Sequence, residues 1–244
     1  MASVPGPDAA TRLLLRPRQL RDLVRGISWL NSLADDEIDD LLAESEVCHL
    51  KAREWVFRQD APAHWLYIVI SGSVRLARSA GHRLATIRCV ERGGPLGQLS
   101  MVSIAGVYLY SAEALRKTQL LAIPATDCRA IMDNHPACRA DFMSGLGLEL
   151  TERLEDLALL TQADAMARLV NYLLRQLPPG HRKSPRVVRL TIPKRWLAAQ
   201  LAMTPETLSR LLGKLRDRGA IDIDHQRLEI IDEQMLQDVL LGDE

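Results

Sequence analysis

The sequence predicts an α+β protein with an antiparallel β-roll in its first half, a long central helix and a C-terminal winged helix-turn-helix. Three observations support this prediction. Between residues 47 and 124, short segments rich in Val, Ile and Leu alternate with Gly, Pro or polar turns, as in antiparallel sandwiches and rolls. From about residue 125 the apolar residues recur at helical spacing. Near the end, two short helical patterns flank a three-residue break.

Length and composition indicate an ordinary soluble protein. The 244 residues suffice for one large or two modest domains, and 47% are apolar and 25% charged. The longest apolar run, near "WLYIVI", is far shorter than the roughly 20 residues of a membrane helix. Three leucines between arginines near the N-terminus are too few for a signal peptide. We therefore expect a cytoplasmic protein with no membrane partner.

The cysteine pattern gives no sign of a metal site. Four cysteines are widely spaced, without a CxxC pair or a histidine at zinc-ligand spacing: Cys48, Cys89, Cys128 and Cys138. We expect them to act as small buried apolar residues, with redox sensing as the alternative.

The elements follow in order and define four parts. Residues 1–24 are a tail, 25–134 a roll domain with flanking helices, 135–162 a long helix and 163–244 a C-terminal domain. In the second part, "LADDEIDDLLAES" predicts a helix that begins at its acidic residues. The strands are predicted from "WLYIVI", "SVRLA", "LATIRCV" and "TQLLAI", and "TDCRAIMDN" predicts a short helix after them.

The long helix has an apolar stripe at steps of three or four residues. The stripe consists of Met143, Leu146, Leu150, Leu154 and Leu157. From the residues alone it has two interpretations, packing within one subunit or a parallel coiled-coil seam with a second copy, and Arg153 interrupts the seam.

The C-terminal pattern predicts a winged helix-turn-helix. Pro193 suits the start of a first helix, "AMT" breaks it, Thr204 is a natural N-cap and Pro205 suits the first position of a second helix. This second helix ends at Gly219. The segment "AIDIDHQRLEII" then predicts a two-stranded wing.

The charge is concentrated in this C-terminal part. The formal net charge of the chain is zero, but residues 165–219 hold 12 Lys and Arg against 2 Asp and Glu. Clustered bases with few acids indicate a polyanionic partner, because phosphate contacts release counterions. We therefore expect binding to double-stranded DNA.

Three polar residues on the second helix are candidates for contacts with bases. Glu206, Ser209 and Arg210 lie at i, i+3 and i+4, at the end that enters the major groove. Arg210 can donate to guanine, and Glu206 can accept from a cytosine amino group. The alternative is a surface Glu206–Arg210 ion pair. Residues expected to contact the DNA backbone are Lys194, Arg195, Thr204, Thr207, Lys214, Arg216 and Arg218.

The order of roll, long helix and winged helix-turn-helix resembles the catabolite-activator/fumarate-nitrate-reductase (CRP/FNR) superfamily. The resemblance spans about residues 25–232 and rests on "FRQDAPAHWLYIVISGSVRLA", "GGPLGQLSM" and "TPETLSRLLGKLRDRGAI". The E-x-x-S-R pattern of Glu206, Ser209 and Arg210 is similar to the FNR branch, which implies a palindrome close to TTGAT-N4-ATCAA. The resemblance also implies a homodimer along the long helix, which favours the seam interpretation, and a contact with RNA polymerase.

The chain departs from the family in three places. Cyclic-nucleotide binders have a Gly-Glu-Leu cassette followed by an arginine pair, whereas this chain has Gly97-Gln98-Leu99 and then Tyr108 and Leu109. A buried phosphate would lack its countercharge there, which argues against cAMP. No cysteine precedes Cys48, which argues against an FNR-type iron–sulfur cluster. The usual glycine of the helix-turn-helix turn is Ala202, which we expect to strain that turn.

The DNR-type nitric-oxide regulators, which use haem, are the remaining similar branch. We predict an apolar effector pocket between the roll and the long helix, formed by Gly97, Gln98, Leu99, Met101, Tyr108 and Tyr110. The candidate haem ligands are His64 and His135. No nucleophile–base pair or phosphate loop supports an enzyme. The predicted function is a transcription regulator, and the alternative is a sensor that acts through protein contacts with a degenerate DNA-binding domain.

Overall fold

The computed structural model describes residues 17–80, 83–162, 164–177, 186–189, 192–224 and 227–241. The chain divides into two compact units, Met1–Leu150 and Thr151–Glu244, and the division falls within one long helix. The first unit has two antiparallel sheets with flanking helices, and the second has helices and a small sheet. The predicted α+β class is therefore confirmed.

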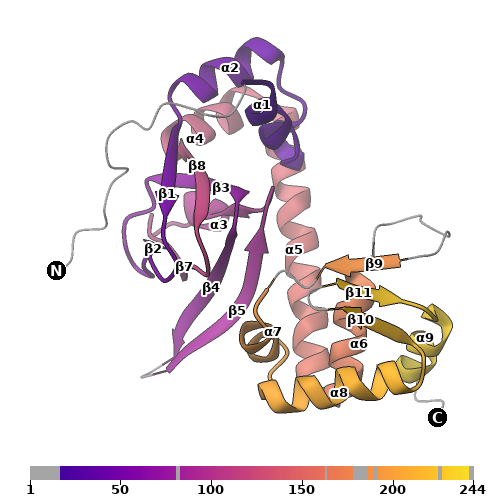
Figure 1. Ribbon diagram of the computed structural model, residues 1–244. Coiled ribbons are helices and arrows are strands. Elements are labelled where there is room, and N and C mark those ends of the chain that lie inside the picture. Colours follow the sequence, from indigo (N-terminus) through magenta and orange to yellow (C-terminus); the bar gives the residue numbers. More distant parts are fainter. Residues whose placement is uncertain are drawn as a thin grey trace. The chain divides into compact units, whose positions relative to one another are not determined.

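The first unit is a β-roll with a group of helices at one end (Figure 1). Its elements before the long helix are α1 (Pro17–Arg25), η1 (Ser28–Leu30), α2 (Asp35–Ala43), β1 (Glu46–Leu50), β2 (Trp55–Phe57), β3 (Trp65–Ser71), β4 (Ser73–Ala80), β5 (Arg83–Glu91), β6 (Pro95–Leu96), α3 (Gln98–Met101), β7 (Ser111–Ala114), β8 (Thr118–Pro124) and α4 (Ala125–Asn134). The described strands form two sheets in the orders β1-β8-β3-β6 and β2-β7-β4-β5.

Strand β3 contributes to two cores, because successive side chains of a strand point to opposite faces. Tyr67 and Val69 lie in the core between the two sheets, together with Leu120 of β8. Leu66 and Ile68 lie in the core between the sheet and the helices. Burial of both faces explains why "WLYIVI" shows no alternation of apolar and polar residues.

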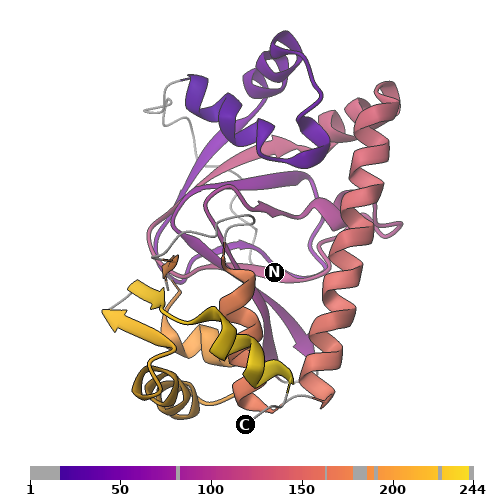
Figure 2. The ribbon, with the colours of Figure 1, turned by 90° about the vertical axis from the view of Figure 1, so that its right-hand side faces the viewer.

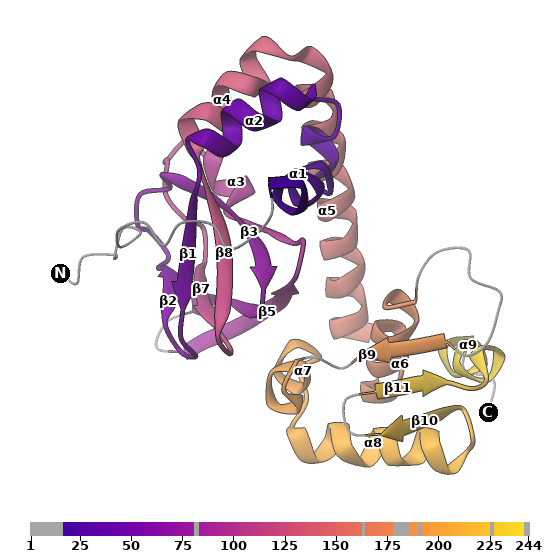
Figure 3. The ribbon, with the colours of Figure 1, turned by 45° about the horizontal axis from the view of Figure 1, so that its top comes forward.

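The helices α1, α2 and α4 lie at the same end of the roll (Figure 3). Their apolar residues share a core with the start of the long helix α5 (Pro136–Gln162). Trp29 of η1 meets Phe142 of α5 edge to face, with ring centroids 5.4 Å apart. This packing fixes the first turns of α5 against the roll.

Helix α5 is a single helix of 27 residues (Figure 2). Its first residue, Pro136, suits this place because an N–H there would have no intrahelical partner. Among the described residues, no helix is both long enough and apolar enough to cross a membrane.

The second unit contains the predicted winged helix-turn-helix. Its elements after α5 are α6 (Ala165–Arg175), β9 (Arg186–Arg189), α7 (Lys194–Gln200), α8 (Pro205–Asp217), β10 (Ile221–Asp224), β11 (Arg227–Ile230) and α9 (Glu233–Leu241). The wing is larger than predicted, because β9 pairs with β11 and gives a three-stranded sheet in the order β10-β11-β9.

Candidate nucleic-acid interface

Helix α8 is anchored by its own leucines and by its N-cap. Leu208, Leu211, Leu212 and Leu215 are buried. At the start of the helix, the hydroxyl of Thr204 accepts a hydrogen bond from the Thr207 amide at 3.2 Å, as the N-cap prediction requires. The opposite face of α8 is thereby held toward solvent.

The turn between α7 and α8 is a Schellman motif. The Met203 amide donates to the Ala198 carbonyl at 2.9 Å, and the Ala202 amide donates to the Ala199 carbonyl at 3.2 Å. Ala202 lies at the left-handed position with φ +50°, where glycine is usual. The predicted strain in this turn therefore has a defined backbone origin.

Arg168 of α6 holds the turn from the other side. Its Nε donates to the Leu201 carbonyl at 2.9 Å, and its Nη2 donates to the Ala202 carbonyl at 3.3 Å. The charge pattern had grouped Arg168 with the bases expected to meet DNA. The sequence contains no local signal for this role, because the partners lie 33 and 34 residues further along the chain.

The three candidate base-contacting residues lie together on the exposed face of α8. Glu206, Ser209 and Arg210 are all exposed. Within the described part of the chain, Glu206 and Arg210 form no ion pair with each other. Hydrogen bonds from its own backbone amide and from the Thr204 hydroxyl lower the pKa of Glu206. The carboxylate therefore stays an acceptor at neutral pH.

The residues predicted to contact the DNA backbone lie on α7, on α8 and at the two ends of α8. Lys194, Arg195, Thr204, Lys214, Arg216 and Arg218 are exposed, and Thr207 is half-buried. Arg216 lies 3.3 Å from Asp217, and the Arg195 guanidinium lies 5.0 Å from the ring centroid of Trp196. Both contacts are at the surface and leave the guanidinium groups accessible to phosphate. The basic residues Arg182 and Lys183 lie outside the described residues.

The apolar stripe of α5 is largely exposed. Met143, Leu150, Leu154 and Leu157 are 62, 61, 58 and 57% exposed. Leu146, which we predicted in the same stripe, instead packs partly against the core shared by the roll and its helices. Gly147 is exposed and lies four residues after Met143 and three before Leu150, so it completes a regular heptad spacing.

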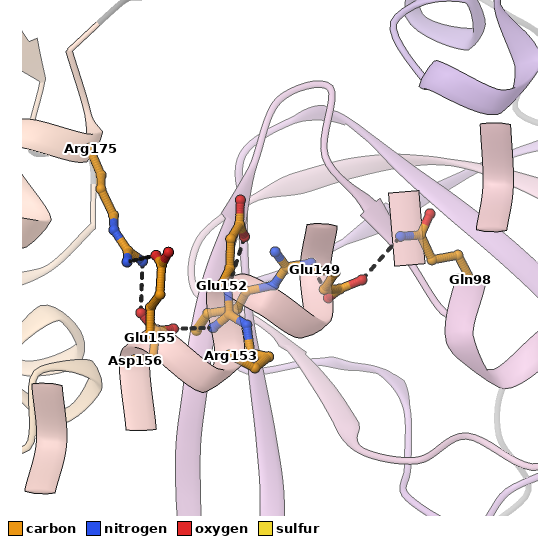
Figure 4. Close-up of polar contacts among 8 residues, drawn as sticks. Gln98, Glu149, Glu152, Arg153, Glu155, Asp156 and Arg175 are labelled. Atoms are coloured by element: carbon orange, nitrogen blue, oxygen red, sulfur yellow. Dashed lines mark hydrogen bonds and ion pairs between the residues drawn. The ribbon is translucent and has the colours of Figure 1, made fainter. Parts of the chain in front are cut away.

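Two clusters of polar side chains include acidic residues of α5 (Figure 4). In the first unit, Glu149 accepts a hydrogen bond from Gln98 Nε2 at 3.3 Å and lies 3.5 Å from Arg88. In the second unit, Arg175 of α6 donates to Asp156 at 2.8 Å and to Glu155 at 2.7 Å. The second cluster joins α6 to the last turns of α5.

The residues predicted to form an effector pocket are divided between two cores. Tyr108 and Tyr110 lie in the core between the two sheets, whereas Met101 lies in the core shared with the helices. Gly97 is buried and Leu99 half-buried. Gln98 lies at the contact with Glu149.

The candidate haem ligands do not match an enclosed haem, which needs an axial imidazole inside a cavity. His64 is exposed, and His135 Nε2 lies 3.0 Å from a Glu37 carboxylate oxygen at the surface. The described residues include no group of three or more His, Cys, Asp or Glu that could hold a metal ion.

Three of the four cysteines, Cys48, Cys89 and Cys128, are poor nucleophiles in this structure. Cys128 and Cys138 are buried, and Cys48 and Cys89 are half-buried. Burial raises the pKa of Cys48 to about 11 and the pKa values of Cys89 and Cys128 to about 12. Few thiolates therefore exist near neutral pH, which does not favour the alternative of redox sensing at these three thiols.

Comparisons with known proteins match both units. Residues 47–135 match the family model described as a cyclic nucleotide-binding domain, and residues 167–239 match the one described as a Crp-like helix-turn-helix domain. The cyclic AMP receptor protein of Thermus thermophilus is 27% identical over 220 residues, which cover 90% of this chain and 99% of that protein.

Two solved structures are similar in fold. FixK2 from Bradyrhizobium japonicum has a TM-score of 0.69 and 20% identity, over 80% of this chain and 96% of that chain. DNR from Pseudomonas aeruginosa has a TM-score of 0.50 and 26% identity, over 92% of this chain and 99% of that chain.

Proposed function

Because the chain belongs to the CRP/FNR superfamily and is a DNA-binding transcription regulator of that type, we propose that its dimer recognises a palindrome of the TTGAT-N4-ATCAA class. Each subunit would contact one half-site through Glu206, Ser209 and Arg210. The family resemblance implies a homodimer, and a two-fold dimer matches the symmetry of a palindrome.

The exposed face of α8 is the observation on which this proposal depends. Its three polar side chains lie on the first turns of a helix whose other face is buried. Arg210 makes no ion pair or hydrogen bond with the described residues, so its guanidinium is available for two bonds to guanine. Glu206 offers an ionised acceptor for a cytosine amino group.

The surrounding bases would supply affinity without base selectivity. Lys194 and Arg195 on α7, Lys214 and Arg216 on α8 and Arg218 at the end of α8 are all exposed. Contacts of this kind with phosphates release counterions, so we expect the affinity to fall steeply as the salt concentration rises. Thr204 and Thr207 would add hydrogen bonds to the backbone at the start of α8.

The dimer would form along α5. The four large apolar side chains of the stripe on this helix, Met143, Leu150, Leu154 and Leu157, are exposed in the monomer, and exposed apolar stripes of regular spacing are typical of helices that pair. We propose RNA polymerase as the further protein partner, on the basis of the family. Transcription from a promoter with the palindrome, with and without the protein, tests that part.

An Arg210→Ala substitution tests the contact with bases. We expect a loss of about 1–3 kcal/mol in binding to the palindrome, together with relaxed selectivity at one position of each half-site. Fluorescence anisotropy with labelled duplexes measures both quantities.

Arg218→Ala is the matched control on the same helix. It should weaken binding to the palindrome and to scrambled DNA alike and lower the salt slope by about 1. If Arg210→Ala binds the palindrome as tightly as the wild type, the assignment of the base contacts is wrong. If the wild type does not prefer the palindrome at all, the alternative of a sensor acting through protein contacts is favoured.

A further inference from the structure

Four aromatic side chains lie together in the interior of the roll. The sequence has only four tyrosines and two phenylalanines, yet Phe57, Tyr67, Tyr108 and Tyr110 all lie in the core between the two sheets. The rings of Phe57 and Tyr108 are stacked, with centroids 3.7 Å apart and an interplanar angle of 10°. Tyr67 and Tyr110 each lie 5.8 Å from Phe57. The rings therefore pack on one another.

The tyrosine hydroxyls bond to backbone groups beside α3. The Tyr108 hydroxyl donates to the Trp65 carbonyl at 2.8 Å and accepts from the Trp65 amide at 3.3 Å. The Tyr110 hydroxyl accepts from the Gly97 amide at 3.0 Å. Residue 97 has to be glycine here, because its φ is +86° and a Cβ would lie 3.1 Å from the Tyr108 ring. The two tyrosine hydroxyls thus bond to backbone donors and acceptors that would otherwise be available to a ligand.

The polar side chains next to this core are engaged by α5. Gln98, directly after Gly97, donates to Glu149 (Figure 4). Arg88 of β5 lies 3.5 Å from the same carboxylate. An anionic ligand at Gln98 would have to compete with Glu149, which lies next to the exposed Leu150 of the α5 stripe.

We propose that the side chains of Tyr108 and Tyr110 permanently fill the space inside the roll that a ligand would take. The Glu149 carboxylate, at the edge of the roll, takes the place of a ligand's anionic group. On this proposal, which rests on the function proposed above, the dimer recognises its palindrome with no small molecule inside the roll. Control would then act on dimer formation or protein concentration. The roll would serve as a fixed platform for α5, although residues 47–135 match a cyclic nucleotide-binding domain.

Ligand titrations of the purified full-length protein test this directly. After exhaustive dialysis, we expect the dissociation constant for the palindrome to change less than about twofold on addition of cAMP or haem. We also expect no shift of the melting temperature and no change in the haem Soret band. A tenfold or larger gain in affinity, or a clear shift of either DNA-independent signal, would overturn the proposal.

The DNA-independent signals separate this proposal from the proposed function. If the protein does not bind the palindrome under any condition, and ligands leave its melting temperature and absorbance unchanged, the proposed DNA recognition is wrong. The proposal that the roll holds no ligand would then still be supported. If DNA binding appears only after a ligand is added, the DNA assignment stands and the occupied roll fails.

Removal of one occupant provides a positive test. Tyr108→Ala should open a cavity of the size of a phenol ring, and p-cresol, which has the shape of the lost side chain, should fill it. We expect p-cresol to raise the melting temperature of Tyr108→Ala and to restore its affinity for DNA. Tyr108→Phe, which keeps the ring, and the wild type should show neither effect.

Equal stabilisation of the wild type and of Tyr108→Ala by p-cresol would show that the interior already admits a ligand, against the proposal. If Tyr108→Ala does not fold, Phe57→Ala with toluene gives the same test, since the Phe57 ring stacks on the Tyr108 ring.

Discussion

Two helices of the DNA-binding unit end in the same motif, but one has glycine and the other alanine at the left-handed position. Helix α8 closes with a Schellman motif in which Gly219 has φ +79°, and its amide donates to the Arg216 carbonyl at 2.8 Å. Helix α7 closes with the same motif, but Ala202 takes the left-handed position. A Cβ in this conformation crowds the following carbonyl oxygen.

Substitutions at Ala202 and Gly219 should change the stability of the protein in opposite directions. Ala202→Gly should stabilise the folded protein by about 1 kcal/mol, because it removes the left-handed strain. Gly219→Ala should destabilise it by a similar amount. Urea unfolding monitored by circular dichroism measures both. A loss of stability in Ala202→Gly would mean that the entropy gained by the unfolded chain exceeds the relieved strain.

The tyrosines of the roll predict a loss of stability in alkali. Burial raises the pKa of Tyr108 to about 12, and burial also raises the pKa values of Tyr67 and Tyr110. A raised pKa means that the folded state prefers the protonated phenol. The stabilisation is complete below the ordinary tyrosine pKa of about 10 and is lost as the pH rises toward about 12.

Phenolate absorbance during an alkaline titration checks this prediction. The three tyrosines of the roll should titrate only as the circular dichroism signal of the fold disappears. Smooth titration near the ordinary pKa in a folded protein would contradict their burial.

At the residue scale, the sequence predicted what local chemistry determines. The N-cap at Thr204 and the phase of the α8 leucines were predictable, and together they place Glu206, Ser209 and Arg210 on the exposed face. The role of Arg168 was not, because its bonds to the turn join distant parts of the chain. The aromatic packing around Tyr108 was missed for the same reason.

At the scale of elements, the sequence predicted the existence of α5 but not its faces. Steps of three and four allow both Leu146 and Gly147 in the stripe. Only the packing of the helix against the roll shows that Leu146 turns toward the core. The pairing of β9 with β11 was not predicted, since strand partners depend on tertiary structure.

Two neighbouring leucines of α5 test the proposed seam. Leu150 and Leu148 are 61 and 69% exposed, but only Leu150 lies on the heptad stripe. Leu150→Glu would place a charge in a dry helix–helix contact, and we expect the dimer dissociation constant to rise roughly a hundredfold. Analytical ultracentrifugation at several protein concentrations measures this change.

Leu148→Glu is the control and should leave the dimer intact. Both substitutions should leave the circular dichroism spectrum unchanged, because both side chains already face solvent. Equal weakening of the dimer by the two would contradict the seam along Met143, Gly147, Leu150, Leu154 and Leu157.

At the scale of the whole molecule, the two units have separate tasks. The first unit holds the start of α5 through the core around Trp29 and Phe142. The second unit presents α8, and Arg175 joins α6 to the end of α5. The dimer would then provide two copies of α8 for two half-sites. The distance between these two helices in the dimer would therefore set the spacing of the half-sites that the protein recognises.

The spacing of the half-sites tests the central claim, a dimer that recognises a palindrome, most directly. The dissociation constant is measured by anisotropy for TTGAT-N4-ATCAA and for the same half-sites with a spacer about five base pairs longer, which turns them to opposite faces of the DNA. We predict that the longer spacer weakens binding by roughly a hundredfold or more. Equal affinity for the two duplexes would contradict the account.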